Sequence, residues 1–237
     1  VIVSAGSINS TQLLELSGIG QATRLKELGI GVVHNLQGVG ENLRDHYSPR
    51  MKWSVPRELG LTYNDKGRGL GLVWQALKYA LSDKGLLGLP AAPLRAYIKT
   101  REGLEAPDAA ISWIPFLANE SFKLHEDSGV TAITHVLRSE STGNIHVSST
   151  DPSHPPAIRF NFLSAQSDRD ILLESMKITR RIMNAGPLQG VMTDEIAPGV
   201  DIENDNEMLD WVKKNAETTY HPVGTCKMGN DPMAVVD

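Results

Sequence analysis

The feature that most constrains the fold is a central series of short segments rich in β-branched and aromatic residues. These segments are residues 50–55, 94–100, 108–114, 130–137 and 144–150. Turn-forming residues separate them, which is the pattern of a sheet built from short strands. Residues 69–85 interrupt the series with the apolar spacing of an amphipathic helix, which we expect Gly85 to close. We therefore predict an α+β fold, in which an antiparallel sheet is flanked by helices.

Two further helices are predicted after the sheet. Residues 167–186 carry apolar side chains at helical spacing, and Gly186 and Pro187 end the pattern. Residues 205–217 have the composition of a last helix.

The segment before the sheet has a different organisation. Residues 1–6 (VIVSAG) are predicted to form a short buried strand, and helices are expected over residues 9–20 and 21–30. Ser7 or Ser10 can cap the first helix, and Gly18 can take a left-handed conformation after its end. Because an ordered loop rich in Gly and Asn follows, residues 1 to about 45 are interpreted as a strand–helix–helix part of an α/β layer.

Size and charge exclude several classes of protein. The 237 residues suffice for one large domain or two modest ones. The formal net charge is −5 and the basic residues are scattered, which argues against a nucleic-acid partner. No apolar run approaches the roughly 20 residues of a membrane span. The single cysteine excludes an internal disulfide and favours a reducing compartment, so we expect a cytoplasmic location.

The chemistry-bearing residues concentrate in residues 218–237, TTYHPVGTCKMGNDPMAVVD. A zinc site needs three or four ligands, and His221 and Cys226 supply too few, so no metal is expected. Cys226 as a nucleophile would need an electropositive setting and a paired base, and a lone cysteine is more often a small packed residue.

His221 has a more specific setting. Pro222 restricts His221 to an extended conformation, and Gly224 lets its own backbone lie close to whatever group is packed above it. An imidazole held in this way is suited to removing a proton from a hydroxyl group, because its pKa lies near neutrality. A histidine that only packs at a domain boundary would fit the same residues, and the sequence alone leaves both interpretations open.

Small residues also mark the beginning of the first helix. Ser4, Ala5 and Gly6 would let a ligand lie close to the backbone near a helix N-terminus, where phosphate is favoured. Turns between strands and helices use the same residues for steric reasons alone, so the pattern is weak by itself.

Taken together, four stretches resemble the glucose–methanol–choline (GMC) family of flavin oxidoreductases, which includes choline dehydrogenases and aryl-alcohol oxidases. They are GSINSTQLLELSGIG, GVGENLRDH, RSESTGNIHVSSTDPSHPPAIRFNFLS and HPVGTCKMG, in the family's order. The first has Thr11 where proline is usual. The last resembles the motif that carries the family's catalytic histidine.

The resemblance implies two domains and one cofactor. Residues 1–45 would belong to an FAD-binding domain, residues 46–215 to a substrate-binding domain, and residues 216–237 would return to the FAD-binding domain and the active site. FAD would accept a hydride while His221 takes the hydroxyl proton of an alcohol. Ser4, Ala5, Gly6, Pro222 and Asp237 are the residues expected to contact FAD. GVGENLRDH would shape the wall of the flavin pocket.

The resemblance also implies that the chain is part of a longer protein. The G-x-G-x-x-G motif that binds the FAD pyrophosphate is absent from the sequence. We therefore expect the oxidoreductase activity to belong to a longer protein and the isolated chain to be inactive. Two other functions remain compatible with the same fold, a hydroxynitrile lyase and a non-catalytic relative. Neither the alcohol, the electron acceptor nor the oligomeric state follows from the sequence.

Overall fold

The computed structural model describes residues 1–119 and 123–237, and the chain divides into two compact units. Unit 1 consists of Val1–His46, Ser139–Asp168 and Thr218–Asp237. Unit 2 consists of Tyr47–Arg138 and Arg169–Glu217. Each unit is therefore assembled from segments that lie far apart in the sequence. The assignment of FAD-binding and substrate-binding roles to particular segments stays a prediction.

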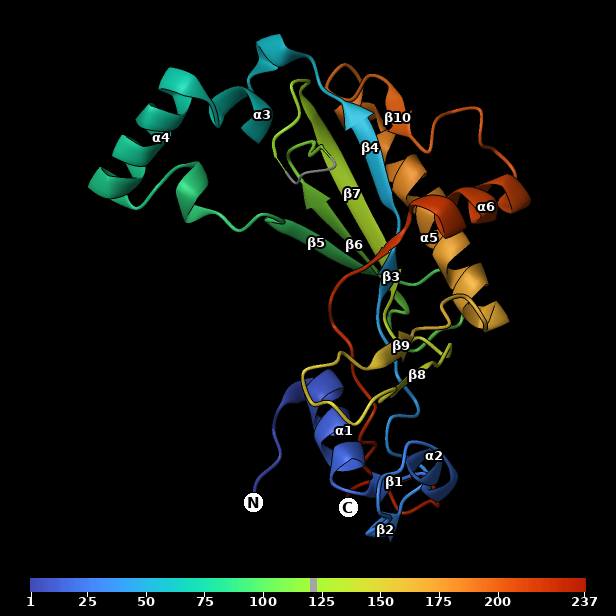
Figure 1. Cartoon of the computed structure of the whole chain (residues 1–237). Coiled ribbons are helices and arrows are strands. Elements are labelled where there is room, and N and C mark those ends of the chain that lie inside the picture. Colours follow the sequence, from blue (N-terminus) through green and yellow to red (C-terminus); the bar gives the residue numbers. More distant parts are fainter. Residues whose placement is uncertain (120–122) are drawn as a thin grey trace. The chain divides into compact units, whose positions relative to one another are not determined.

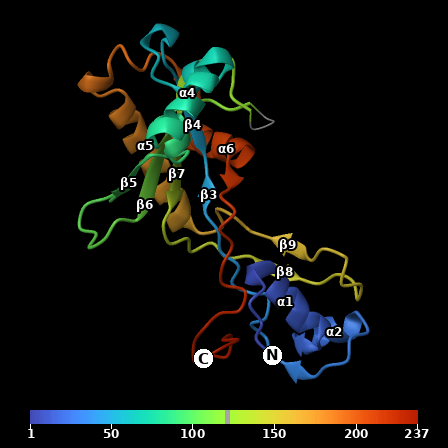
Figure 2. The same ribbon diagram turned by 90° about the vertical axis from the view of Figure 1, so that its left-hand side faces the viewer.

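Unit 2 is built on a five-stranded sheet with the order β10-β4-β7-β6-β5, in which every neighbouring pair is antiparallel (Figure 1). In chain order, the strands of this sheet are β4 (Arg50–Ser54), β5 (Leu94–Ile98), β6 (Ala109–Ile114), β7 (Gly129–Val136) and β10 (Glu195–Ala197). Figure 2 shows β5 and β6 as a hairpin joined by an extended loop. The predicted antiparallel sheet is thus confirmed for four of its five predicted segments, with β10 added at its edge. The fifth predicted segment, residues 144–150, was wrongly placed in it, because residues 144–146 pair instead with residues 157–159 in unit 1.

The alternation of side chains gives this sheet two different faces. In β4, Met51 and Trp53 are buried, whereas Arg50 and Lys52 point to the opposite face because successive side chains alternate. Helix α5 (Gln166–Met183) covers the apolar face, where Thr134 Oγ1 of β7 donates to Ser175 Oγ at 2.8 Å. Burying each large apolar side chain at such a contact contributes about 1.5–3 kcal/mol.

The other helices of unit 2 begin at recognisable caps. They are α3 (Tyr63–Lys66), α4 (Gly69–Ser82) and α6 (Asp205–Asn215), with the 3₁₀ turns η1 (Arg57–Leu59), η2 (Leu86–Gly88) and η3 (Gly186–Leu188). Thr62 and Asp65 form a reciprocal capping box at α3, and Asn204 accepts the N–H of Glu207 at 3.0 Å before α6. Helix α4 ends at Ser82, and its C-cap Asp83 is in the left-handed region, two residues before Gly85, which the sequence predicted to close the helix.

Unit 1 contains two helices and short strand pairs. Its elements are α1 (Gly6–Leu16), β1 (Ile19–Gly20), α2 (Ala22–Glu27), β2 (His34–Asn35), β8 (Asn144–His146) and β9 (Ala157–Arg159). β1 and β2 pair in parallel and β8 and β9 antiparallel. Gly18 has φ +81°, which confirms the left-handed conformation predicted after α1. Two further strands, β3 (Tyr47–Ser48) and β11 (Glu217–Thr218), pair with each other where the chain passes from one unit to the other.

A largely buried cluster of one histidine and two glutamates fixes the loop that follows β2. His146 lies between two carboxylates, with Nδ1 2.7 Å from Glu15 Oε1 and Nε2 3.1 Å from Glu41 Oε1. Glu15 also accepts the N–H of Val147 at 2.7 Å. Because α1, β8 and the loop each supply one of these groups, the cluster holds the loop containing GVGENLRDH against α1 and β8.

Two predictions about local structure were wrong. Val1–Ser4 is exposed and forms no strand, because no strand in the described residues lies beside it to supply hydrogen bonds. The N-cap of α1 is Ala5, and neither Ser7 nor Ser10 caps the helix in the usual way. Instead, Ser10 Oγ accepts the N–H of Ala5 at 3.1 Å, whereas Ser7 bonds to a distant segment of unit 1.

Candidate active site

His221 lies in a tight loop after β11, and backbone conformations on both sides of it are unusual. Tyr220 has φ +62° and Gly224 has φ +97°, both in the left-handed region. A Cβ at Gly224 would come within 2.3 Å of the carbonyl oxygen of Asn42. Gly224 therefore permits a close approach, as predicted from the sequence, and the group that approaches is the backbone of the GVGENLRDH loop.

The loop of His221 lies alongside residues 42–46 as a short antiparallel bridge. The N–H of Arg44 donates to Val223 O at 2.8 Å, and the N–H of Val223 donates to Arg44 O at 2.9 Å. The side-chain amide of Asn42 also donates to Gly224 O at 3.2 Å. The two motifs HPVGTCKMG and GVGENLRDH thus form one local structure.

Asp45 is the buried acceptor beneath this loop. Its Oδ1 accepts the N–H groups of His46 at 2.7 Å and of His221 at 3.0 Å, and its Oδ2 accepts the hydroxyl of Thr218. The side chain is buried within unit 1. Sequence reasoning missed this role, because an acceptor for a backbone N–H and a hydroxyl more than 170 positions away leaves no periodic signal. An acidic residue in a loop rich in Gly and Asn is the only hint.

The imidazole of His221 is exposed, and contacts with Thr219 and His46 restrict its orientation. Nδ1 lies 3.3 Å from Thr219 Oγ1. The ring of His46 meets it edge to face, with centroids 5.8 Å apart and planes at 86°. In the described residues no hydrogen bond involves Nε2 of His221. One ring nitrogen is therefore held by the protein while the other is accessible.

The start of α1 is tied to the same loop. Ser7 Oγ donates to Pro222 O at 2.5 Å, and Thr225 Oγ1 donates to Ser7 O at 2.6 Å. These bonds bring the predicted cofactor-contacting segment Ser4–Gly6 to the neighbourhood of Pro222. Asp237 is exposed, and within residues 1–119 and 123–237 no hydrogen bond or ion pair joins its side chain to either segment.

The surroundings of Cys226 do not favour a nucleophile. The thiol is half-buried, and burial raises its pKa, which a hydrogen bond with Thr11 offsets only in part. Where the structure describes the chain, no group of three or more His, Cys, Asp or Glu side chains is arranged to hold a metal ion.

Unit 2 has cavities of its own. The larger, about 940 Å³, lies on the face of the sheet opposite α5 and is lined by β4, β6, β7 and the end of α6. Among the aromatic residues, Phe116 lines this cavity, whereas Trp53 is buried in the core and Trp74 is exposed on α4. Trp211, which the sequence did not single out, lines it too.

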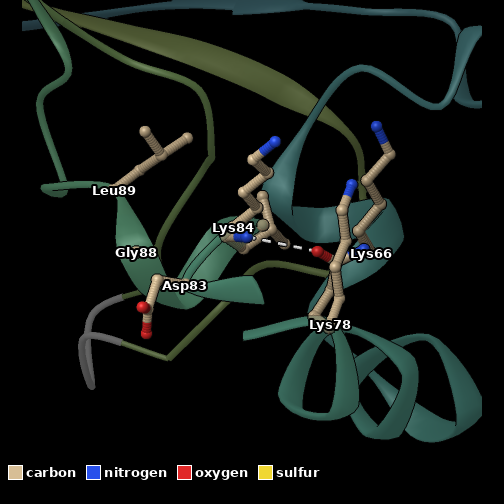
Figure 3. Close-up of a pocket in the computed structure, with 9 residues that line it drawn as sticks. Lys66, Lys78, Asp83, Lys84, Gly88 and Leu89 are labelled. Carbon is tan, nitrogen blue, oxygen red and sulfur yellow. Dashed lines mark hydrogen bonds between the residues drawn. The ribbon is translucent and has the colours of Figure 1, made fainter. Parts of the chain in front are cut away.

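A smaller cavity of about 350 Å³ lies between α4 and η2. Figure 3 shows Lys66, Lys78 and Lys84 around it, with the carboxylate of Asp83 set apart from the three ammonium groups. Gln75 Oε1 accepts the N–H of Leu86 at 3.1 Å, and both residues line this cavity.

No helix among the described residues is both long and apolar enough to cross a membrane.

Comparison with known proteins gives a consistent result. Two family models, both described as GMC oxidoreductase, match residues 1–48 and residues 139–237. The chain is 36% identical over 241 residues to the oxygen-dependent choline dehydrogenase of Pseudomonas aeruginosa (strain LESB58). That alignment covers 100% of this chain and 42% of the relative, so the chain spans less than half the length of that protein.

Solved structures share the fold. Pyridoxine 4-oxidase from Mesorbium loti matches with a TM-score of 0.76 and 23% identity, covering 98% of this chain and 42% of that one. An FAD-dependent oxidoreductase from Chaetomium thermophilum matches with a TM-score of 0.84 and 19% identity, covering 97% and 46%. At such identities the likeness establishes the fold alone.

Proposed function

The chain belongs to the GMC oxidoreductase family, and from that membership we propose that it forms part of an FAD-dependent oxidoreductase acting on CH–OH donors. The reaction converts an alcohol to an aldehyde or a ketone. The observation that carries the proposal is the clamped loop that holds His221 with its imidazole exposed, next to the start of α1. The name of the Pseudomonas relative makes choline one alcohol to test.

The residues at the start of α1 fit a flavin cofactor. Gly6 has φ +77°, and a Cβ built there would have no heavy atom within 4 Å, so the backbone is open. Ser4 and Ala5 are exposed beside it. Backbone N–H groups at a helix start favour an electron-rich group. Ser4, Ala5, Gly6 and Pro222 would hold FAD, which supplies a hydride acceptor when bound; a contact from Asp237 stays a prediction.

His221 would act as the base that removes the hydroxyl proton of the alcohol. The hydroxyl of Thr219 lies 3.4 Å from His46 O and can donate its single hydrogen to that carbonyl. In that arrangement Thr219 Oγ1 would accept a hydrogen from His221 Nδ1, 3.3 Å away. The proton would then be on Nδ1 and the lone pair on the accessible Nε2, the nitrogen proposed to take a proton.

Asp45 and Thr219 would be positioning residues, since each acts through His221. Asp45 fixes the backbone on which the imidazole is mounted, and Thr219 fixes the ring's tautomer. Holding a base in one orientation lowers the entropic cost of reaching the transition state.

The test uses the full-length protein that contains this chain, loaded with FAD. An alcohol added without oxygen should bleach the flavin absorbance, and His221→Ala should slow the bleaching by about 10²–10⁴-fold, the usual contribution of a general base. The matched control is His34→Ala, which removes an exposed imidazole from β2. Flavin that stays oxidised during turnover would indicate a lyase, and unchanged bleaching in His221→Ala would refute the assigned base.

A further inference from the structure

The larger cavity of unit 2 combines basic side chains with apolar walls. Its volume is about 940 Å³, within the range of small-molecule sites. The basic residues of its sheet wall follow from the register of β4: Arg50 lies opposite Ile133 and Lys52 opposite Thr131 on β7, all on the face away from α5. The strand alternation that buries Met51 and Trp53 therefore places two cations in the cavity wall.

The charges in this cavity do not cancel. Arg50 Nη2 lies 2.7 Å from Glu217 Oε2, so these two groups neutralise each other. Lys52 and Lys214 line the same cavity, and Glu217 is the one carboxylate among its described lining residues. Among the described residues of the cavity wall, positive charges thus exceed negative ones by two, in a chain whose formal net charge is −5. A concave surface focuses such a field and raises the local concentration of anions.

The remaining walls favour an organic molecule over an inorganic ion. Phe116 and Trp211 supply aromatic surface, and Ile114 and Ile133 supply aliphatic surface. The smaller cavity in Figure 3 also has three lysines, but no aromatic side chain is among its described lining residues, and its volume is about 350 Å³. Cations together with aromatic walls distinguish the larger cavity.

We propose that the larger cavity of unit 2 binds an organic anion, with a carboxylate attracted by Lys52 and Lys214 and an apolar or aromatic body against Phe116 and Trp211. With unit 2 as the substrate-binding part, a prediction on which this inference rests together with the proposed function, the substrate class becomes an alcohol that carries a carboxylate. A cationic alcohol such as choline is disfavoured, because it would meet an excess of like charge.

The experiment compares three alcohols on the full-length flavoprotein: 4-(hydroxymethyl)benzoate, benzyl alcohol and choline, which are anionic, neutral and cationic. Dissociation constants are measured by calorimetry, and kcat/KM by steady-state turnover. The anionic alcohol should bind at least about tenfold more tightly than benzyl alcohol, and this ratio should fall with added salt because screening weakens charge attraction. Choline should bind more weakly than either.

Lys52→Met and Lys214→Met should each lower the ratio of anionic to neutral affinity by about threefold to tenfold, as the loss of one favourable charge predicts. Lys213→Met is the matched control on α6, since Lys213 pairs with Asp210 at 3.0 Å and does not line the cavity. Lys78→Met is the control for lysines of the smaller cavity. Both controls should leave the ratio unchanged.

Two results would overturn the proposal: tighter binding of choline than of the carboxylate, or a ratio that neither Lys52→Met nor Lys214→Met changes. Calorimetry separates this inference from the proposed reaction. A protein that binds the carboxylate through Lys52 and Lys214 but oxidises none of the three alcohols would support the anion site and refute the substrate class drawn from it, while the oxidoreductase function is tested separately by flavin bleaching.

Discussion

Asp45 accepts hydrogen bonds from residues 173 and 176 positions away in the sequence, and those bonds determine where His221 lies. A buried N–H left without its acceptor costs about 1–3 kcal/mol, and tenfold in rate corresponds to about 1.4 kcal/mol. Small displacements of a catalytic base reduce the rate more than they reduce substrate affinity. At the scale of single residues, Asp45 is therefore the first test of the site.

Asp45→Ala should lower kcat by about 10–100-fold, because the loop loses its acceptor, while KM changes less. Asp45→Asn keeps the oxygen that accepts the two N–H groups, so it should recover most of the rate. Steady-state kinetics on the flavin-loaded full-length protein measures both. An equal loss of kcat in the two variants would show that turnover depends on the negative charge of Asp45 and not on the position of the loop.

Thr219 allows a second residue-scale prediction. Thr219→Val removes the oxygen that accepts the proton from Nδ1, so the imidazole no longer has one preferred tautomer, and kcat should fall by about tenfold. Thr219→Ser keeps the oxygen and should retain near-normal turnover. A valine variant with unchanged kcat would contradict the proposed tautomer.

At the scale of elements, Asp168 joins the first turn of α5 to the segment after β7. It accepts the hydroxyl of Ser139 at 2.5 Å and the N–H groups of Glu140 and Ser141 at 2.9 and 2.8 Å. Burial alone would raise the pKa of Asp168, but the hydrogen bonds from Ser139, Ser141 and Glu140 outweigh it, so the pKa lies below its usual value.

A lowered pKa in the folded state makes the contribution of Asp168 depend on pH. The stabilisation is complete above the unfolded pKa of about 3.9 and is lost as the pH falls through the lower folded pKa. Asp168→Asn should therefore reduce the free energy of unfolding by about 1–3 kcal/mol at pH 7, and by less near pH 3. Urea denaturation of the full-length protein at both pH values measures this; the exposed Asp201→Asn is the control. If the free energy of unfolding lost in Asp168→Asn were the same at both pH values, a lowered pKa of Asp168 in the folded state would be contradicted.

The elements that the sequence predicted are those with a long periodic signal. In α5, Leu172, Met176 and Met183 recur at helical spacing and are buried against the sheet. Strand β10 was missed because its three residues are too short for a period, and its place depends on pairing with β4. The grouping of Ser139–Asp168 with unit 1 was likewise not foreseen, because it depends on contacts between distant segments. Pro222 and Gly224 mark His221 as a candidate base in the sequence. No pattern in the sequence marks Asp45 and Thr219 as the residues that contact it.

At the scale of the whole molecule, the chain passes from one unit to the other at four places. Residues of the candidate site lie next to the first and the last of these places. Asp45 lies just before the first crossing, and Thr218 lies just after the last. The hydrogen bond between them joins the first and the last segment of unit 1. Neither unit is a continuous segment, so the two ends of unit 1 come together only when the intervening chain folds.

This connectivity leads to a prediction about the isolated 237-residue chain. Only a few residues of this chain are proposed to contact the flavin. The G-x-G-x-x-G loop, which binds a pyrophosphate at a helix N-terminus, is absent from its sequence. We expect the isolated chain to lose added FAD during gel filtration, whereas the full-length protein retains it. Circular dichroism of the same sample should show helical and strand signals, which verifies that the isolated chain is folded. Retention of one FAD per folded chain would show that the start of α1 and the His221 loop bind the cofactor without the pyrophosphate loop.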